Sequence, residues 1–101
     1  MSRTALFVID IQHGLALDPQ TAIPHASRVI ESSAAILNKA RAHIDSARAG
    51  GRIPNLEVIV VQHEETPDRG TLQRGSQAWE LVFPPRDGNE NERLVGKDVR
   101  M

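Results

Sequence analysis

Hydrophobic and polar positions along the chain form two short apolar runs separated by one long amphipathic segment. The runs cover residues 4–9 and 56–63, and both have the length of strands buried on two faces. Between them, from about residue 25 to residue 49, apolar residues recur at steps of three and four, which predicts a helix with one buried stripe. The predicted stripe consists of Val29, Ser33, Ile36, Leu37, Ala40, Ile44 and Ala47. A strand, a helix and a strand in this order predict a right-handed βαβ unit with parallel strands.

The rest of the chain lacks such regular patterns. Residues 12–24 are predicted to be a loop, because Gly14 and two prolines interrupt them. Residues 64–92 are polar and rich in Gly and Pro, and a segment of this length without regular structure is typical of a functional loop. Its one apolar piece, "QAWELVF", is short and is either helical or extended. Residues 92–101 begin a third strand-like segment.

These elements predict an α/β protein, namely the N-terminal half of a three-layer α/β/α, Rossmann-like, mainly parallel sheet. A chain of 101 residues has room for one domain. A parallel sheet needs helices on both faces, however, and one long helix covers only one of them. We therefore expect residues 1–101 to be a partial domain with exposed apolar sheet surface, which associates with another copy as a homo-oligomer.

Composition excludes several classes of partner and site. The net charge is −1 and aromatic residues are 3%, so the chain lacks the basic surface and the stacking side chains of nucleic-acid-binding proteins. No apolar run approaches the roughly 18 residues of a membrane span, and the N-terminus lacks the long apolar region of a signal peptide. The chain has no cysteine, which excludes disulfides and zinc-thiolate sites within it and fits a cytoplasmic protein.

Polar residues follow each predicted strand, where ligands bind in open parallel sheets. Asp10 follows the first strand, Gln62 and His63 end the second, and Lys97 lies in the third segment. An acid and a lysine brought together there could manage proton transfer. Each residue also has a simpler interpretation: Asp10 as a turn cap, Lys97 as a solvated surface residue, and Gln62 and His63 as hydrogen-bonding loop residues. Trp79 is most simply a packing anchor for the long loop.

Other sites lack their motifs. The chain contains no GxGxxG after its first strand, no GxxxxGK[ST], no HExxH and no GxSxG. "VIDIQ" carries a single carboxylate, which counts against a two-aspartate magnesium site and against a receiver-type or nucleotide-binding half-domain. No Asp and His pair has the spacing of zinc ligands. These absences leave zinc bound through Asp and His open on the residues alone.

Four motifs in order resemble the isochorismatase-like cysteine hydrolase superfamily, which includes nicotinamidases and N-carbamoylsarcosine amidohydrolases. "TALFVIDIQHG" resembles the first strand with its catalytic Asp and the Gln that follows. "VIVVQHEE" resembles the second strand with its polar exit, and "RGSQAWEL" the loop that packs over the site. "LVGKDVRM" resembles the segment that delivers the catalytic lysine. The match spans nearly the whole chain but only the N-terminal part of the family's domain.

The resemblance implies hydrolysis of a small amide C–N bond by a triad of Asp, Lys and Cys. Asp10 would be the general acid and base, and Lys97 would lower the pKa of the thiol and stabilise developing negative charge. The substrate-binding residues would be Gln12, Gln62, His63 and Trp79. The residues that hold a metal in nicotinamidases have no clear counterpart in this chain, so we predict no metal and no cofactor. The family's nucleophile lies after the fourth strand, beyond Met101, so we expect this chain to be truncated before it and inactive.

Two alternative functions remain open on the sequence. The first is a non-catalytic α/β binding or pseudoenzyme module that associates with a homologous chain. The second is hydrolysis of a vinyl ether of the isochorismate type, which some members of the superfamily catalyse without the cysteine by protonation through the aspartate. Asp10, Gln62 and Lys97 would suit that chemistry.

Overall fold

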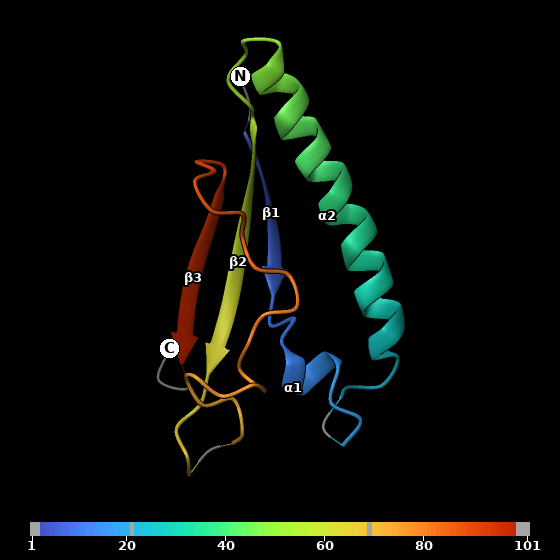
Figure 1. The fold of residues 1–101 in the computed structure, drawn as a ribbon, viewed down its shortest axis with the longest axis vertical. Coiled ribbons are helices and arrows are strands. Elements are labelled where there is room, and N and C mark those ends of the chain that lie inside the picture. The colour runs from blue at the N-terminus through green and yellow to red at the C-terminus, as the bar shows by residue number, and fades with distance from the viewer. Residues whose placement is uncertain (1–2, 21, 69, 99–101) are drawn as a thin grey trace.

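A computed structural model of the chain describes residues 3–20, 22–68 and 70–98, with the side chain of Asp98 left out. Three strands, one long helix and one short helix make up its regular structure (Figure 1). Their bounds are β1 Thr4–Ile9, α1 His13–Ala16, α2 Ala26–Ala49, β2 Leu56–Glu64 and β3 Glu92–Asp98. The α/β fold predicted from the apolar pattern is confirmed. The last three residues of the third predicted segment, 99–101, lie outside the described residues.

The sheet is parallel, with β2 in the centre and β1 and β3 as its neighbours. Ile9 pairs with Val61, and Val61 pairs in turn with Val95. Because paired residues in a parallel sheet point to the same face, this register assigns every strand side chain to one of two faces. It also brings the carboxyl ends of the three strands to one edge of the sheet (Figure 1).

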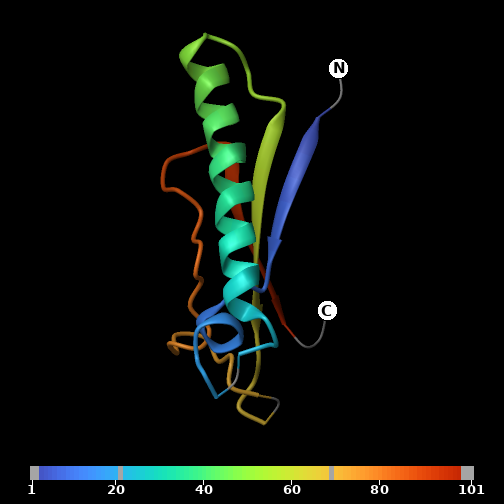
Figure 2. The same ribbon diagram turned by 90° about the vertical axis from the view of Figure 1, so that its right-hand side faces the viewer.

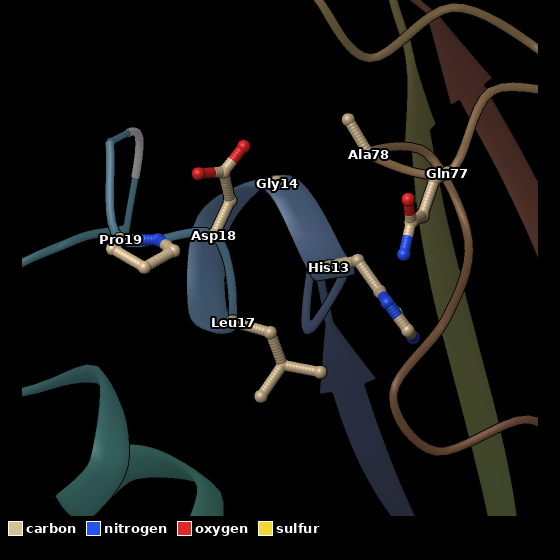
Figure 3. Close-up of a pocket in the computed structure, with 7 residues that line it drawn as sticks. All are labelled: His13, Gly14, Leu17, Asp18, Pro19, Gln77 and Ala78. Carbon is tan, nitrogen blue, oxygen red and sulfur yellow. The ribbon is translucent and has the colours of Figure 1, made fainter.

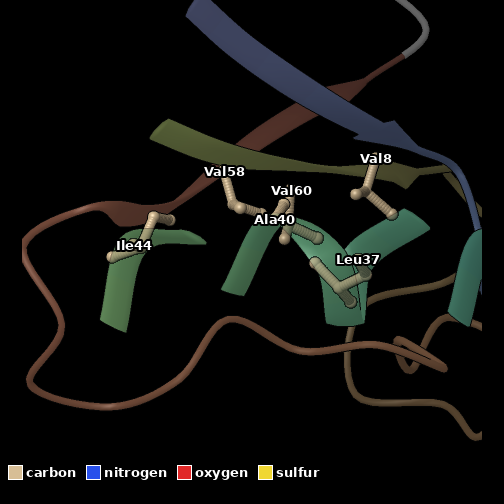
Figure 4. Close-up of a cluster of buried hydrophobic side chains, with 6 residues drawn as sticks. All are labelled: Val8, Leu37, Ala40, Ile44, Val58 and Val60. Carbon is tan, nitrogen blue, oxygen red and sulfur yellow. The ribbon is translucent and has the colours of Figure 1, made fainter. Parts of the chain in front are cut away.

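Helix α2 covers one face of the sheet (Figure 2). The core between them consists of Val8, Leu37, Ala40, Ile44, Val58 and Val60 (Figure 4). The predicted stripe is confirmed for four helix residues, Leu37, Ala40, Ile44 and Ala47, which are buried. The prediction was wrong for Ile36, which is 54% exposed. Ile36 lies at the edge of the helix, where with Ser33 it lines an apolar groove along β1.

The opposite face of the sheet has no covering helix within the described part of the chain (Figure 2). Phe7 is 56% exposed, Ile9 53% and Val95 44%. The register places all three on the face that points away from α2. The exposed apolar sheet surface predicted from the single helix is therefore confirmed. We call these three residues the open face.

The prediction of a loop over residues 12–24 was wrong at one point, because His13–Ala16 forms the short helix α1. The turn packs tightly against the long loop: the Gly14 N–H donates to the Ala78 carbonyl at 2.9 Å. A Cβ atom at Gly14 would lie 2.9 Å from the Cβ of Ala78, so only glycine fits without movement. In the described part of 65–91 there is neither helix nor strand, and Leu81 makes one isolated antiparallel bridge to Gln12.

A buried ion-pair network ties β3 and the long loop to α2. The Glu92 side chain is 0% exposed, and its carboxylate accepts hydrogen bonds from the Arg41 Nη2 at 2.8 Å, from the Arg86 side chain and from the Arg86 N–H at 2.9 Å. Arg86 extends the network to the exposed Asp45 at 3.0 Å. Burial alone would raise the pKa of Glu92, but these hydrogen bonds outweigh it and hold the pKa below the ordinary value. The hydrogen bond from Arg86 likewise lowers the pKa of Asp45.

Candidate active site

Asp10 stands at the point where β1 leaves the sheet. Its N–H still donates to the Val61 carbonyl at 3.0 Å, as a further strand residue would. Its φ angle is +59°, in the left-handed region that L residues other than Asn and Asp seldom adopt. The backbone therefore turns sharply at the carboxylate. Such uncommon conformations cluster at functional sites.

Lys97 reaches this carboxylate from β3, the strand on the other side of β2. Its Nζ atom lies 3.1 Å from the Asp10 Oδ2 atom. Lys97 belongs to β3 and pairs with His63 of β2, so the contact spans the central strand. The two side chains are 34% and 29% exposed, respectively, which leaves both within reach of a small molecule. The structure thus brings together the acid and the lysine that the strand ends predicted.

Two buried polar atoms beside this ion pair have no hydrogen-bond partner among the described residues. They are the Oδ1 atom of Asp10 and the Nδ1 atom of His63. His63 pairs with Lys97, so both side chains point to the face of the sheet that α2 does not cover. The Nε2 atom of His63 is 3.9 Å from a Glu65 carboxylate oxygen. An unpaired buried polar atom is costly unless a ligand or water completes it. The partly exposed ion pair is the polar group within reach of a small molecule at this end of the sheet, and the two unpaired atoms lie buried next to it.

The other predicted substrate-binding residues are connected to one another by hydrogen bonds between side chains and backbone. Gln12 is 0% exposed, and its Nε2 atom donates to the carbonyls of His63 at 2.9 Å and Trp79 at 2.6 Å. Gln62 is 6% exposed and donates to the same Trp79 carbonyl at 3.0 Å. Both amide hydrogens of Gln12 are therefore used within the chain. Trp79 is half-buried in the loop, where its backbone is what the two glutamines hold.

A separate cavity of about 340 Å³ lies beside α1, and neither Asp10 nor Lys97 lines it. His13, Leu17 and Asp18 form one side, and Gln77 and Ala78 of the long loop form the other (Figure 3). The loop that lines one side of this cavity is the one that Gln12 and Gln62 hold through the Trp79 carbonyl.

No metal cluster accompanies the pair in the residues the structure describes: no three His, Asp or Glu side chains are placed to hold an ion. Within the same residues, no helix is long and apolar enough to cross a membrane.

Solved structures of known proteins show what this chain is similar to. No family model matches the chain, and no curated protein sequence matches it. Several solved structures, by contrast, match the chain. An isochorismatase-like hydrolase from Alkaliphilus metalliredigens aligns with 95% of the chain at a TM-score of 0.67 and 17% identity. The chain resembles the isochorismatase-like hydrolases.

Two further structures extend this isochorismatase-like resemblance. An N-carbamoylsarcosine amidase from Thermoplasma acidophilum aligns with 94% of the chain at a TM-score of 0.56 and 20% identity. A Burkholderia xenovorans LB400 protein, provisionally described as an isochorismatase, aligns with 96% at a TM-score of 0.51 and 29% identity. The chain spans about half of each structure: 49% of the Alkaliphilus protein, 51% of the Thermoplasma protein and 41% of the Burkholderia protein. The resemblance predicted from the four sequence motifs is confirmed.

Sequence reasoning missed the way Gln12 is used. The family resemblance predicts a substrate contact at this position, two residues after Asp10, and that stays a prediction. The structure shows that the side chain is buried and bonded to backbone groups. The available signal was its neighbourhood: Gln12 follows the apolar run and Ile11 with no glycine or proline between them. A polar side chain at such a buried position has to find backbone partners.

Proposed function

We propose that the chain contributes the acid and the lysine of a hydrolase that acts on a small amide C–N bond. The observation that supports this is the 3.1 Å contact between Lys97 Nζ and Asp10 Oδ2 at the carboxyl ends of parallel strands. The isochorismatase-like fold raises the same expectation, and one matched structure is described as an N-carbamoylsarcosine amidase. The nucleophile is a cysteine thiol, and it has to come from outside these 101 residues, which contain no cysteine.

In this mechanism Asp10 transfers one proton in each half of the reaction, first from the thiol to the leaving nitrogen and then from water to the sulfur. Its carboxylate takes the proton of the thiol, and the thiolate adds to the amide carbon to form a tetrahedral oxyanion. Asp10 then gives the proton to the leaving nitrogen, the C–N bond breaks and an acyl thioester remains. Water, which passes a proton to Asp10, hydrolyses the thioester, and that proton returns to the sulfur. The ammonium group of Lys97 stabilises the thiolate and the negative charge that develops on the oxyanion.

The first prediction concerns the chain alone. With nicotinamide or N-carbamoylsarcosine as substrate we expect no ammonia release, because no thiol is present to attack the carbonyl. We expect binding nevertheless, seen as shifts of the NMR signals of Asp10, His63 and Lys97 on titration with either amide. Asp10→Asn should remove these shifts, whereas Asp87→Asn, at an exposed loop residue, should leave them unchanged.

Three results distinguish the alternatives. Amide turnover that Asp10→Asn abolishes would show that the chain is complete as it stands. Turnover of isochorismate that depends on Asp10 would establish the vinyl ether reaction, in which the aspartate acts as the acid without a thiol. Absence of any shift at the pair with all these compounds would favour the binding or pseudoenzyme module.

We also propose that the chain is a homo-oligomer that uses the open face. Phe7 and Ile9 of β1 are each more than half exposed. An exposed apolar patch of this kind favours association with a second copy of the chain, which removes these side chains from water. A cytoplasmic location stays a prediction from the absence of cysteine.

The second prediction tests this association. Sedimentation of the wild-type chain is expected to show a mass that rises with protein concentration. Phe7→Ser should weaken the association at least tenfold, since burying one large apolar side chain contributes about 1.5–3 kcal/mol. Ile53→Ser is the matched control, because Ile53 is 92% exposed but lies in the loop between α2 and β2. A wild-type mass that stays monomeric over the whole concentration range would contradict the proposal.

A further inference from the structure

Beyond the end of β1, one residue of β2 loses its backbone hydrogen-bond partners, and the side chain of Gln12 replaces them. In the ladder between β1 and β2, alternate residues of β2 direct their N–H and C=O groups toward β1. Val61 does so, and its carbonyl accepts from the Asp10 N–H at 3.0 Å. His63 is the next such residue, but β1 has already turned away at Asp10.

Both backbone groups of His63 are satisfied by the amide of Gln12. The His63 N–H donates to Gln12 Oε1 at 2.9 Å, and Gln12 Nε2 donates to the His63 carbonyl at 2.9 Å. Had β1 continued, the Asp10 carbonyl and the Gln12 N–H would occupy these two places. The Gln12 N–H instead donates to the Asp10 carbonyl at 3.0 Å, which closes a three-residue turn. A side-chain amide thus replaces a peptide group of the missing strand.

This replacement is what frees Asp10 from the sheet. The chain can turn at Asp10, with its φ of +59°, because no ladder group of His63 is left unpaired when it does so. The turn leaves the Asp10 carboxylate over the end of β2, 3.1 Å from Lys97. The second Nε2 hydrogen of Gln12 holds the Trp79 carbonyl, so the same amide also fixes the long loop beside the site.

We propose that Gln12 is the positioning residue of the Asp10–Lys97 pair: its buried amide completes β2 in place of β1 and so holds the Asp10 carboxylate at Lys97. The catalytic meaning of this role rests on the proposed function, but the geometry does not. A substrate contact is not needed to explain Gln12, because it is wholly buried and both its amide hydrogens are bonded.

The experiment measures the pair directly by zero-length cross-linking with a carbodiimide, which joins a carboxylate to an amine in contact. Lys97 and Lys39 are the chain's two lysines, so the Asp10–Lys97 cross-linked peptide is identified by mass spectrometry without ambiguity. Gln12→Met keeps the side-chain volume and removes the three hydrogen bonds. We expect it to lower the cross-link yield about tenfold, as loss of a few hydrogen bonds that hold one local conformation would.

Gln62→Met is the matched control. Gln62 is also a buried glutamine bonded to the Trp79 carbonyl, but its amide does not take part in the two hydrogen bonds that complete His63. Its cross-link yield should stay near that of the wild type. An unchanged yield in folded Gln12→Met, or an equal drop in both variants, would overturn the inference.

Wild-type hydrogen exchange keeps the inference testable if Gln12→Met does not fold. The His63 amide should exchange as slowly as that of Val61, although β1 does not pair with it. Fast exchange at His63 would overturn the inference. Neither measurement uses turnover or amide binding. Failure of the proposed hydrolase function would therefore appear in the titrations with amides, while the cross-link and the exchange rate stay as stated.

Discussion

Glu92→Gln is expected to lower the free energy of unfolding by about 3–5 kcal/mol, the usual cost of breaking a buried ion pair by removing one partner. The Glu92 side chain is 0% exposed and stands between Arg41 and Arg86. Gln keeps the shape but removes the charge, so the two guanidinium groups lose their shared counter-ion. Small domains have about 5–15 kcal/mol of stability in total, so this loss should be a large fraction of the total.

Urea unfolding followed by circular dichroism measures this effect. Asp45→Asn is the matched control, because it also removes a carboxylate bonded to Arg86, but one whose side chain is 54% exposed. An exposed pair of this kind contributes about 0–1 kcal/mol. Equal losses in the two variants would contradict the argument from burial.

Acid should act on the same carboxylate. The pKa of Glu92 is held below its ordinary value of 4.5, so the folded state binds its proton less readily than the unfolded chain does. The contribution of Glu92 is therefore complete above the unfolded pKa and is lost as the pH falls through the folded one. Wild-type stability should drop on acidification below about pH 4.5, and Glu92→Gln should flatten that part of the curve. A drop of equal steepness in both would assign the acid sensitivity to other groups.

Ile44→Ala is expected to cost about 2–5 kcal/mol, the range found for truncation of large aliphatic side chains in cores. Ile44 is 0% exposed and packs in the cluster between α2 and the sheet (Figure 4). Ile36→Ala on the same helix is the control, since Ile36 is 54% exposed, and we expect it to cost less than about 1 kcal/mol. Thermal or urea unfolding of both variants measures the difference.

The comparison of these two isoleucines also tests whether the apolar groove along β1 is covered in solution. Ile36 lines the apolar groove beside β1 with Phe7 and Ile9. A loss at Ile36 as large as that at Ile44 would show that the groove is filled when the protein is in solution, for instance by a second copy of the chain. A small loss would indicate that Ile36 itself takes no part in the association.

Local patterns were sufficient to predict the strands and the long helix. Residues 4–9 and 56–63 match β1 and most of β2, because a run of consecutive apolar and β-branched residues suits a buried strand wherever the chain carries it. The predicted helix end at residue 49 is also correct, and it lies directly before Gly50 and Gly51, where Gly51 has a φ of +73°. Ile36 was mispredicted because the helical period defines a stripe but not where the sheet beneath it ends.

The candidate site is likewise predictable from the sequence only in part. The strand ends alone placed Asp10 and Lys97 on one edge of the sheet, since parallel strands share that edge. The contact between them depends on the register of three strands and on the turn at Asp10, which no local pattern encodes. The roles of Gln12 and Glu92 depend on tertiary structure as well. Each is a polar residue whose partners lie far along the chain, 51 residues away for His63 and for Arg41.

The sequence by itself thus determined the βαβ order, the uncovered face and the two ionisable residues at the strand ends. It could do so because strand and helix periods, and the direction of parallel strands, follow from local geometry. Only the tertiary structure decided that Asp10 and Lys97 meet, that a glutamine completes the central strand and that a buried glutamate ties the long loop to the helix. Those outcomes depend on which distant backbone and charged groups each buried polar atom finds, and the choice exists only once the chain has packed.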